Sequence, residues 1–343
     1  AFNAGGYNNR STITDYYNTD SYYYDVAFNT YALDWVDTTQ SSVASAFRMS
    51  QFRGLDQDVE VIEKGKLGEI GIYLATEFQK NFYLGVSVGF PVGRYVYESY
   101  VLETDTQQYY DIEDMLSEER IEASISGFNV RLGGMYNFKD RLKIGASYVF
   151  EHSLSIEEEY SLAMSTRFNT PDSDGNFNYR DDQKGNVEYK VVRPARAKLG
   201  VSIKPINRVI ISVSGEYVNY QNIELQDLDR RIENEQQDLI QSDFNKVFNY
   251  SGGLEVIVRD DLQVRAGYAY QPSTRDFKDV TRHFISGGFS YGFWDQMRVN
   301  VGGQYVFWED DFVLYTSDVA NVSEIIQEQV GRLKIMAGIS LGF

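Results

Sequence analysis

The side chains that could carry out chemistry are few in this chain of 343 residues, which holds two His and no Cys. Without Cys there is no disulfide, no thiolate metal site and no thiol catalysis. His152 stands beside Ser153, and His283 stands alone. A nucleophilic serine needs a histidine oriented onto its hydroxyl, whereas adjacent residues of a strand point to opposite faces. We therefore predict no catalytic residue, no metal site and no cofactor, and keep a hydrolase only as a weak alternative.

Basic residues offer a second kind of chemistry, because they fall on one face of the strands predicted below. The basic residues of this face are Arg131, Lys143, Arg196, Lys198, Arg265, Arg298 and Lys334. Its acidic residues are Glu77, Glu151, Glu216 and Glu255. A guanidinium binds a carboxylate through two parallel hydrogen bonds, so this face favours a carboxylate site. The candidate ligands of that carboxylate are Arg131, Arg196, Arg265, Lys198 and Arg298. Charge pairing between neighbouring strands is the alternative role for each of them.

A period-two alternation of apolar and small residues positions these charges. The segment "GEIGIYLATEF" from Gly68 and the segment "FYLGVSVGF" from Phe82 are two examples, and the unit returns up to "RLKIMAGISLGF" at the C-terminus. Such alternation predicts strands. The second face is rich in Gly, Ser, Asn and Gln rather than Lys, Glu and Thr, and aromatic residues gather at the strand ends. This pattern favours a lipid-facing β-barrel over a soluble β-sandwich.

Short turns alternate with long polar connections along the strands. Lys139-Asp140 is one short turn, predicted to close a hairpin between "FNVRLGGMYNF" and "RLKIGASYVF". The long connections are residues 103–118, 161–188, 221–245 and 309–327. Short turns on one side and long loops on the other are typical of an outer-membrane barrel, whose long loops face the cell exterior.

A strand count gives the topology. From Gly68 to Phe343 we count eleven strands, and an even-numbered barrel with both ends in the periplasm then needs three strands before Gly68. We therefore expect an all-β, antiparallel transmembrane β-barrel of about fourteen strands when complete. Residues 1–66 would hold the end of one strand and a long extracellular loop, and residues 67–343 the barrel. The chain lacks a signal peptide and reads as N-terminally incomplete.

The long first loop carries apolar residues at helical rather than strand spacing. Val26, Phe28, Tyr31, Leu33 and Trp35 lie in one segment, and a second segment follows Ser42, a suitable N-cap. Two short helices at the cell surface could capture a hydrophobic molecule. The alternative, to which we give equal weight, is that these helices only pack on one another over the barrel mouth.

Charge sets limits on the partners. The chain has 32 Lys and Arg against 50 Asp and Glu, a net charge of -18, which opposes binding to nucleic acid. The acidity must lie mainly in loops, which could contact protein partners or bridge to lipopolysaccharide through divalent ions, although solvated charge is the simpler explanation. The last strand ends in Phe343, and an aromatic C-terminal residue resembles the signal by which outer-membrane proteins reach the barrel-assembly machinery.

Three segments resemble a known family, the FadL/TodX-type outer-membrane transporters of long-chain fatty acids and other hydrophobic compounds. They are "GEIGIYLATEFQKNFYLGVSVGFPVGRYVYES", "RPARAKLGVSIKPINRVIISVSGEYVNY" and "GGLEVIVRDDLQVRAGYAYQPS". The opening "NNRSTITDYY" and "DVAFNTYALDW" resemble versions from Bacteroidetes-type bacteria. The resemblance implies fourteen strands, in agreement with our count. It also implies an N-terminal hatch with an Asn-Pro-Ala motif, which this sequence does not contain.

The resemblance implies that a fatty acid-like ligand is caught at the surface, passes into the lumen and leaves sideways through the barrel wall. Transport would be passive and ligand-gated, without a chemical reaction. A structural or partner-binding barrel is the main alternative, and an outer-membrane lipid hydrolase a weaker one. Outer-membrane lipid, including lipopolysaccharide, would surround the protein.

Overall fold

The computed structural model describes residues 21–35, 43–45, 55–276, 278–294, 297–317 and 322–341. The predicted strand end in residues 1–20 and the C-terminal Phe343 lie outside these ranges. The described helices are α2 (Ser21–Asn29), α3 (Arg230–Asp243) and the short 3-10 helix η1 (Tyr220–Asn222). None of the described helices has the length and apolar character needed to cross a membrane.

Nearly all the rest of the described chain is β-structure. A small pair joins β1 (Leu33–Trp35) to β2 (Val43–Ser45). The large sheet contains β3 (Leu55–Gln79), β4 (Phe82–Asp105), β5 (Ile112–Gly127), β6 (Asn129–Phe138), β7 (Leu142–Val149), β8 (His152–Phe168), β9 (Asn178–Arg193), β10 (Arg196–Ile206), β11 (Val209–Asn219), β12 (Glu224–Gln226), β13 (Lys246–Arg259), β14 (Leu262–Gln271), β15 (Arg282–Trp294), β16 (Met297–Ser317) and β17 (Val322–Leu341).

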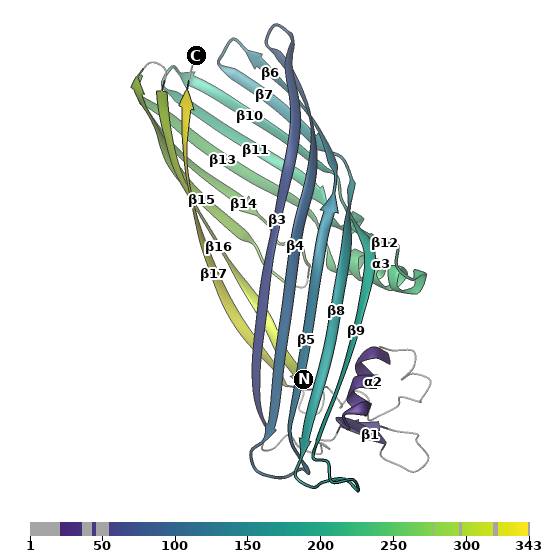
Figure 1. The fold of residues 1–343 in the computed structure, drawn as a ribbon. Coiled ribbons are helices and arrows are strands. Elements are labelled where there is room, and N and C mark those ends of the chain that lie inside the picture. The colour runs from purple at the N-terminus through teal and green to yellow at the C-terminus, as the bar shows by residue number, and fades with distance from the viewer. Residues whose placement is uncertain are drawn as a thin grey trace.

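The large sheet has fifteen strands, and every pairing in it is antiparallel. It curls so that β3 and β4 pass in front of β13, β14 and β15 (Figure 1). The short turns lie at one end of the sheet, at the top of the figure, which we call the turn end. In the β6–β7 turn, Lys139 and Asp140 both have positive φ, 49° and 54°, as a tight two-residue hairpin turn requires. The predicted hairpin is therefore confirmed.

Four strands are interrupted along one line across the sheet, which we call the waist. The interruptions lie at Phe128, at residues 150–151, at residues 194–195 and at η1, and they follow one another across paired strands. Next to them, β4 carries Pro91, which has no N–H to donate. Each interrupted strand resumes on the other side of the waist as the next strand in the chain: β5 as β6, β7 as β8, β9 as β10 and β11 as β12.

With these continuations joined, fifteen strands become eleven passes of the chain, as the alternation predicted. The remaining strands of the expected fourteen stay a prediction, because β3 and β17 each pair on one side only among the described residues. The sheet also begins earlier than expected, since β3 starts at Leu55 and crosses the predicted boundary at residue 67.

The structure corrects the prediction of long polar loops, because strands and a helix occupy most of these stretches. Strands β4 and β5 leave only residues 106–111 between them, and β8 and β9 leave only residues 169–177. In the connection 221–245, the structure contains β12 and α3, and β16 and β17 take up most of residues 309–327. These stretches lack an apolar face of the kind that marks a lipid-facing strand, so the sequence pattern did not reveal them. Their outer faces in β5, β8 and β9 are charged and carry cross-strand ion pairs such as Arg167–Asp114 and Arg180–Glu118.

Between the turn end and the waist, the strands have the lengths that a membrane requires. β6, β7, β10 and β14 contain 8 to 11 residues, close to the roughly 9–11 that a tilted membrane strand needs. One face, which we call the outer face, presents exposed apolar side chains such as Leu84, Leu132 and Leu199. The opposite, inner face carries Gly, Ser and the predicted basic residues.

Beyond the waist, β4, β5, β8 and β9 continue together with β3 as a five-stranded extension (Figure 1). From Arg94 to Asp105 it measures about 36 Å, at roughly 3.3 Å per residue. Here the polarity of the two faces is reversed. The outer face is charged and carries ion pairs, including Arg94–Glu122, Arg120–Glu98 and Arg180–Glu118.

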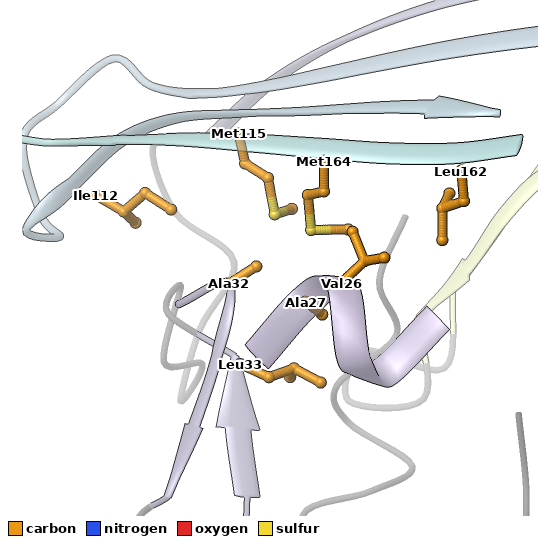
Figure 2. Close-up of a cluster of buried hydrophobic side chains, with 8 residues drawn as sticks. All are labelled: Val26, Ala27, Ala32, Leu33, Ile112, Met115, Leu162 and Met164. Atoms are coloured by element: carbon orange, nitrogen blue, oxygen red, sulfur yellow. The ribbon is translucent and has the colours of Figure 1, made fainter. Parts of the chain in front are cut away.

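The inner face of the extension is mainly apolar, and helix α2 covers its far end. Val26 and Ala27 of α2, with Ala32 and Leu33 after it, pack against Ile112 and Met115 of β5 and against Leu162 and Met164 of β8 (Figure 2). Polar contacts fix the helix in place. Thr166 Oγ1 donates to the Thr30 carbonyl at 2.5 Å, and Asn29 Nδ2 donates to Asp181 Oδ2 at 2.8 Å.

The N-terminal segment differs in part from the prediction. The first helix exists as α2, but Val43–Ser45, where a second helix was expected to begin, forms β2 and pairs with Leu33–Trp35. Strand pairing with β1 satisfies these backbone groups, so Ser42 is not followed directly by a helical turn. Residues 46–54 lie outside the described residues.

Candidate functional site

Basic side chains gather on the inner face at the waist. Arg131 of β6 and Arg196 of β10 both lie opposite Val149 of β7, and Arg193 of β9 lies opposite His152 of β8. The charges of the three arginines act on one another and on His152. We call Arg131, Arg193, Arg196 and His152 the waist cluster. Its members come together because the interruptions bring the ends of β9 and β10 to the same level as the start of β6.

Glu69 of β3 supplies a counter-charge to one side of the waist cluster. Its Oε2 accepts hydrogen bonds from Arg131 Nη2 at 2.5 Å and from Asn129 Nδ2 at 2.8 Å. Asn129 is almost fully buried, and its Oδ1 has no hydrogen-bond partner in the described structure. The Glu69 carboxylate lies over Gly89, where a Cβ atom would meet it at 2.6 Å, so a larger residue at this position would displace the carboxylate. One predicted arginine, Arg131, is therefore ion-paired.

Arg193 and Arg196 differ from Arg131 in this respect. Neither makes an ion pair with any residue that the structure describes, and both are half-buried. Glu69 is close enough to act on Arg193 electrostatically but hydrogen-bonds Arg131 instead. Cationic groups that are partly removed from water without a counter-ion favour binding of an anion. Arg193 and Arg196 therefore form the anion-seeking part of the waist cluster.

An apolar surface leads to this cluster from the extension. Between the α2 cluster and the waist, the inner face includes the carboxylates of Glu63, Glu119 and Glu158, but most of its side chains are aliphatic or aromatic. The aliphatic and aromatic side chains are Tyr95 and Tyr97 of β4, Ile121, Ala123 and Ile125 of β5, Leu154, Ile156 and Tyr160 of β8, and Val187, Tyr189 and Val191 of β9. The hydroxyls of Tyr95 and Tyr189 already donate to Glu63 and Glu158, each at 3.1 Å. They are therefore not free to donate to the anionic group of a ligand.

On the other side of the waist, the inner wall is built from small residues. Ser202 and Ser212 share a hydrogen bond of 2.9 Å, and Ser214 and Ser251 one of 2.6 Å. Hollows of about 530 Å³ and 610 Å³ lie along this wall. Small side chains leave room for a passing molecule where larger ones would fill the space.

Arg265 holds the middle of the wall together. Its guanidinium donates to Glu255 at 2.5 Å, to Ser290 Oγ at 2.6 Å and to Gln263 at 3.0 Å. The network continues from Ser290 to Asn300 at 2.5 Å. Because it donates three hydrogen bonds and pairs with Glu255, Arg265 fits the alternative of cross-strand charge pairing.

Of the two other predicted basic residues, Lys198 adjoins the waist cluster, because it lines the same hollow as Arg131, and Arg298 lies apart from it. Lys198 of β10 contacts the 530 Å³ hollow, next to small residues of β6 and β7, and makes no ion pair among the described residues. Arg298 lies one residue into β16 from the turn end and opposite Ser340. The structure thus brings Arg131 and Arg196 together, with Lys198 next to them, and separates Arg265 and Arg298 from them.

A polar cavity of about 440 Å³ adjoins Arg196 at the mouth of the inner wall. The loop 272–281 covers it and is tied to the end of α3 by hydrogen bonds from Asn245 N to the Thr274 carbonyl and from Asp276 N to the Asp243 carbonyl. Arg282 contributes to its lining while its guanidinium lies 5.0 Å from the Trp308 ring. This cavity enlarges the space beside Arg196 in which a polar head group could be accommodated.

The predicted surface-capture residues have mixed positions. Val26 and Leu33 are 0% and 2% exposed, because they fill the core between α2 and the extension. They are therefore not available at the surface, and they pack on β5 and β8 rather than on a second helix as the alternative supposed. Phe28 packs against the same cluster, and Tyr31 is 50% exposed with its ring 4.7 Å from Tyr179. For Trp35, only the backbone lies within the described structure.

The two histidines have contacts that explain them without catalysis. His152 Nδ1 lies 2.9 Å from the Phe150 carbonyl, and His283 Nδ1 lies 2.8 Å from the Tyr268 hydroxyl. The His283 ring also stacks on Phe307 at 5.1 Å. In the described part of the chain, neither imidazole is bonded to a serine hydroxyl, and no group of three acidic or histidine side chains could hold a metal ion.

Sequence reasoning missed Arg193 and the apolar inner face of the extension. The signal for Arg193 was its place in "VVRPAR", where a proline separates two arginines by three positions. The alternation was followed only in strands with apolar outer faces, so the reversed alternation in β9, "NYRDDQKGNVEYKVVR", was taken for loop.

These features define a class of protein: an antiparallel sheet with membrane-length strands, an apolar outer face, a small-residue inner wall and a water-exposed extension. Residues 71–335 match the model of the family "Outer membrane protein transport protein (OMPP1/FadL/TodX)". The chain therefore belongs to this family of outer-membrane transport proteins, as the sequence resemblance indicated. A comparison with curated proteins finds no match.

Solved structures with the same fold include a FadL homologue from Pseudomonas aeruginosa. It is 15% identical, with a TM-score of 0.53 over 80% of this chain and 68% of that chain. The toluene transporter TodX from Pseudomonas putida is 13% identical, with a TM-score of 0.46, covering 85% of this chain and 80% of that one. The protein thus resides in the outer membrane.

Proposed function

We propose that this protein takes up long-chain fatty acids, or similar hydrophobic carboxylates, across the outer membrane by passive, ligand-gated diffusion and without catalysing a reaction. The ligand's tail would lie on the apolar inner face of the extension, and its carboxylate would bind Arg193 and Arg196. The single observation that supports this most strongly is the position of two half-buried arginines, without ion pairs among the described residues, at the foot of that apolar face.

The energetics of the two parts are complementary. Transfer of an alkyl chain from water contributes about 0.8 kcal/mol per buried CH₂, so a long tail supplies most of the affinity. A hydrogen bond to a charged group adds about 1.5–3 kcal/mol, which selects an acid over a neutral molecule with the same tail. Selection therefore depends on the waist cluster, while affinity depends on the apolar surface.

The Arg131–Glu69 pair would supply the ligand-gated step. It lies next to Arg196 on the inner face, at the level where the passage enters the small-residue wall. An incoming carboxylate can replace Glu69 as the partner of Arg131, because both are carboxylates that use the same guanidinium. Release of Glu69 would then let the ligand move from the waist into the hollows along the wall.

Equilibrium binding of a long-chain fatty acid, its methyl ester and an alkane of equal length to the purified protein tests this proposal. The acid should bind about tenfold or more tightly than the ester, as expected for hydrogen bonds to charged groups. Arg193→Ala and Arg196→Ala should each remove that preference. Arg298→Ala, at the turn end of the same face, is the matched control and should retain it.

Two outcomes would count against the proposal. Equal binding of acid and ester by the parent would remove the role of the waist cluster, although uptake of neutral hydrophobic compounds would remain compatible with the apolar surface. Absence of binding for all three probes would favour the alternative of a structural or partner-binding barrel.

A further inference from the structure

Two basic residues lie directly opposite each other on the outer face of the extension. Lys66 of β3 is paired with Arg94 of β4. Lys64 lies two residues before Lys66 in β3 and points to the same face. Like charges in directly opposed positions of a sheet destabilise it unless an anion lies between them. The arrangement therefore calls for a negative partner.

The described residues supply that partner only in part. Arg94 pairs with Glu122, which also receives Arg120. Lys64 and Lys66 are exposed and make no ion pair with any described residue. The acids of β3 on either side of them face inwards: Glu63 accepts a hydrogen bond from Tyr95, and Glu69 binds Arg131. Lys64 and Lys66, together with the part of the Arg94 guanidinium that Glu122 does not bind, are left for an external anion.

The position of these residues along the strands identifies the source of the anion. On the turn-end side, the outer face of the same two strands carries Ile70, Ile72, Phe90 and Val92, all exposed apolar side chains. On the far side, Glu98 and Arg120 begin the charged outer face. Lys66 and Arg94 thus lie at the step from lipid-facing to water-facing surface, where the head groups of the outer leaflet lie.

We propose that Lys64, Lys66 and Arg94 bind a phosphate group of an outer-leaflet lipid such as lipopolysaccharide. Lysine presents a compact ammonium with three donors and arginine a planar fork, and both suit a phosphate at the membrane surface. This contact would fix the height at which the extension leaves the membrane. It does not depend on what the inner face carries, so it stands or fails separately from the proposed transport.

Native mass spectrometry of the purified protein in detergent micelles tests the contact. The probes are phosphorylated lipid A, the same lipid A after enzymatic removal of its phosphates, and inorganic phosphate. The variants are Lys64→Gln/Lys66→Gln and the control Lys184→Gln, which lies further out on the same outer face beside Asp182. Heat-modifiable gel mobility verifies that each variant is folded.

The parent should retain phosphorylated lipid A, and the double variant should bind it about thirtyfold more weakly, since each basic residue near the surface contributes roughly 1 kcal/mol. Lys184→Gln should match the parent. Equal retention of dephosphorylated lipid A, or unchanged retention by the folded double variant, would overturn the proposal. So would retention that requires added divalent ions but not the lysines, or saturable binding of inorganic phosphate with no retained lipid.

Discussion

Arg193 and Arg196 lie on either side of the Pro194–Ala195 interruption, and both face the inner surface at the waist. In an uninterrupted strand, residues three positions apart would face opposite sides. The break between β9 and β10 removes that constraint. The neighbouring segment is interrupted at the same level, because the link from β7 to β8 is one residue longer than the link from β5 to β6 that it lies beside. The interruption of the sheet therefore places both arginines on the same face, where they form the candidate site.

Replacement of Glu69 by Gln should strengthen binding of a fatty acid by about two- to fivefold. The change removes the carboxylate that occupies Arg131, and the pair is partly exposed, so the gain is limited to roughly the value of a surface ion pair. Equilibrium binding of the acid measures the effect, with Glu255→Gln, the partner of Arg265 deeper in the wall, as the control. Weaker binding by Glu69→Gln would show that Glu69 positions the site rather than competing with the ligand.

Replacement of both Ile125 and Ile156 by Ser should weaken binding of a long-chain acid by about tenfold or more. The two side chains face each other across β5 and β8 on the inner face, and each buried apolar side chain contributes roughly 1.5–3 kcal/mol. The loss should grow with the length of the ligand's tail. Binding measured for a series of acids checks this, with Ser124→Ala on the outer face as control. A loss that is independent of tail length would contradict the assigned surface.

Met164→Ala should release α2 without unfolding the sheet. Met164 is fully buried against α2, and removal of such a side chain costs about 2–5 kcal/mol. Hydrogen exchange should show α2 losing protection while β6, β10 and β14 keep theirs. Ser165→Ala, the adjacent residue on the opposite face, should leave α2 protected. Loss of protection across all strands would mean that α2 is needed for the whole fold. By the same reasoning, Ser in place of Leu33 would detach α2 rather than remove a capture surface.

The loop between β8 and β9 should tolerate mild acid. The Tyr179 hydroxyl donates to Asp172 at 2.6 Å, and with the Asn176 and Asp174 amides it holds the pKa of the Asp172 carboxyl below its usual range. The same bond raises the pKa of Tyr179 to about 12. A lowered carboxyl pKa stabilises the loop at every pH above the unfolded value near 4, and this contribution is lost only as the pH falls towards the lower folded value.

Hydrogen exchange of the Asp174 and Asn176 amides, corrected for intrinsic rates, measures this behaviour. Their protection should be unchanged between pH 7 and pH 4.5, and Asp172→Asn should lose it already at pH 7. Loss of protection in the parent between pH 6 and pH 4.5 would contradict the assigned sign.

The sequence was sufficient to predict the membrane part of the fold. Alternation in segments such as "FYLGVSVGF" reflects one lipid-facing side and one small-residue side, so the strand count and the Lys139-Asp140 hairpin followed from it. It was insufficient for the extension. In β9, the charged outer face and the mixed inner face resemble a polar loop, and only pairing with β8 shows which residues share a side.

The site was predictable in part for a similar reason. Strand parity placed Arg131 and Arg196 on the inner face, but parity cannot show whether a charge has a partner, and Arg265 proved to be fully engaged. Parity also fails across an interruption, which is why Arg193 was missed. Burial of Val26 and Leu33 depends on β5 and β8, which lie far away in the sequence, and no local pattern contains that contact.

The most direct test of the central claim is photo-cross-linking with a long-chain fatty acid that carries a diazirine at the end of its tail. The account predicts that cross-links map to the inner face of β5, β8 and β9, around Ile125, Ile156 and Tyr189, and that Arg193→Ala/Arg196→Ala removes them, whereas Arg298→Ala does not. Cross-links confined to outer-face residues such as Phe90 and Phe128, unaffected by the arginine changes, would contradict it.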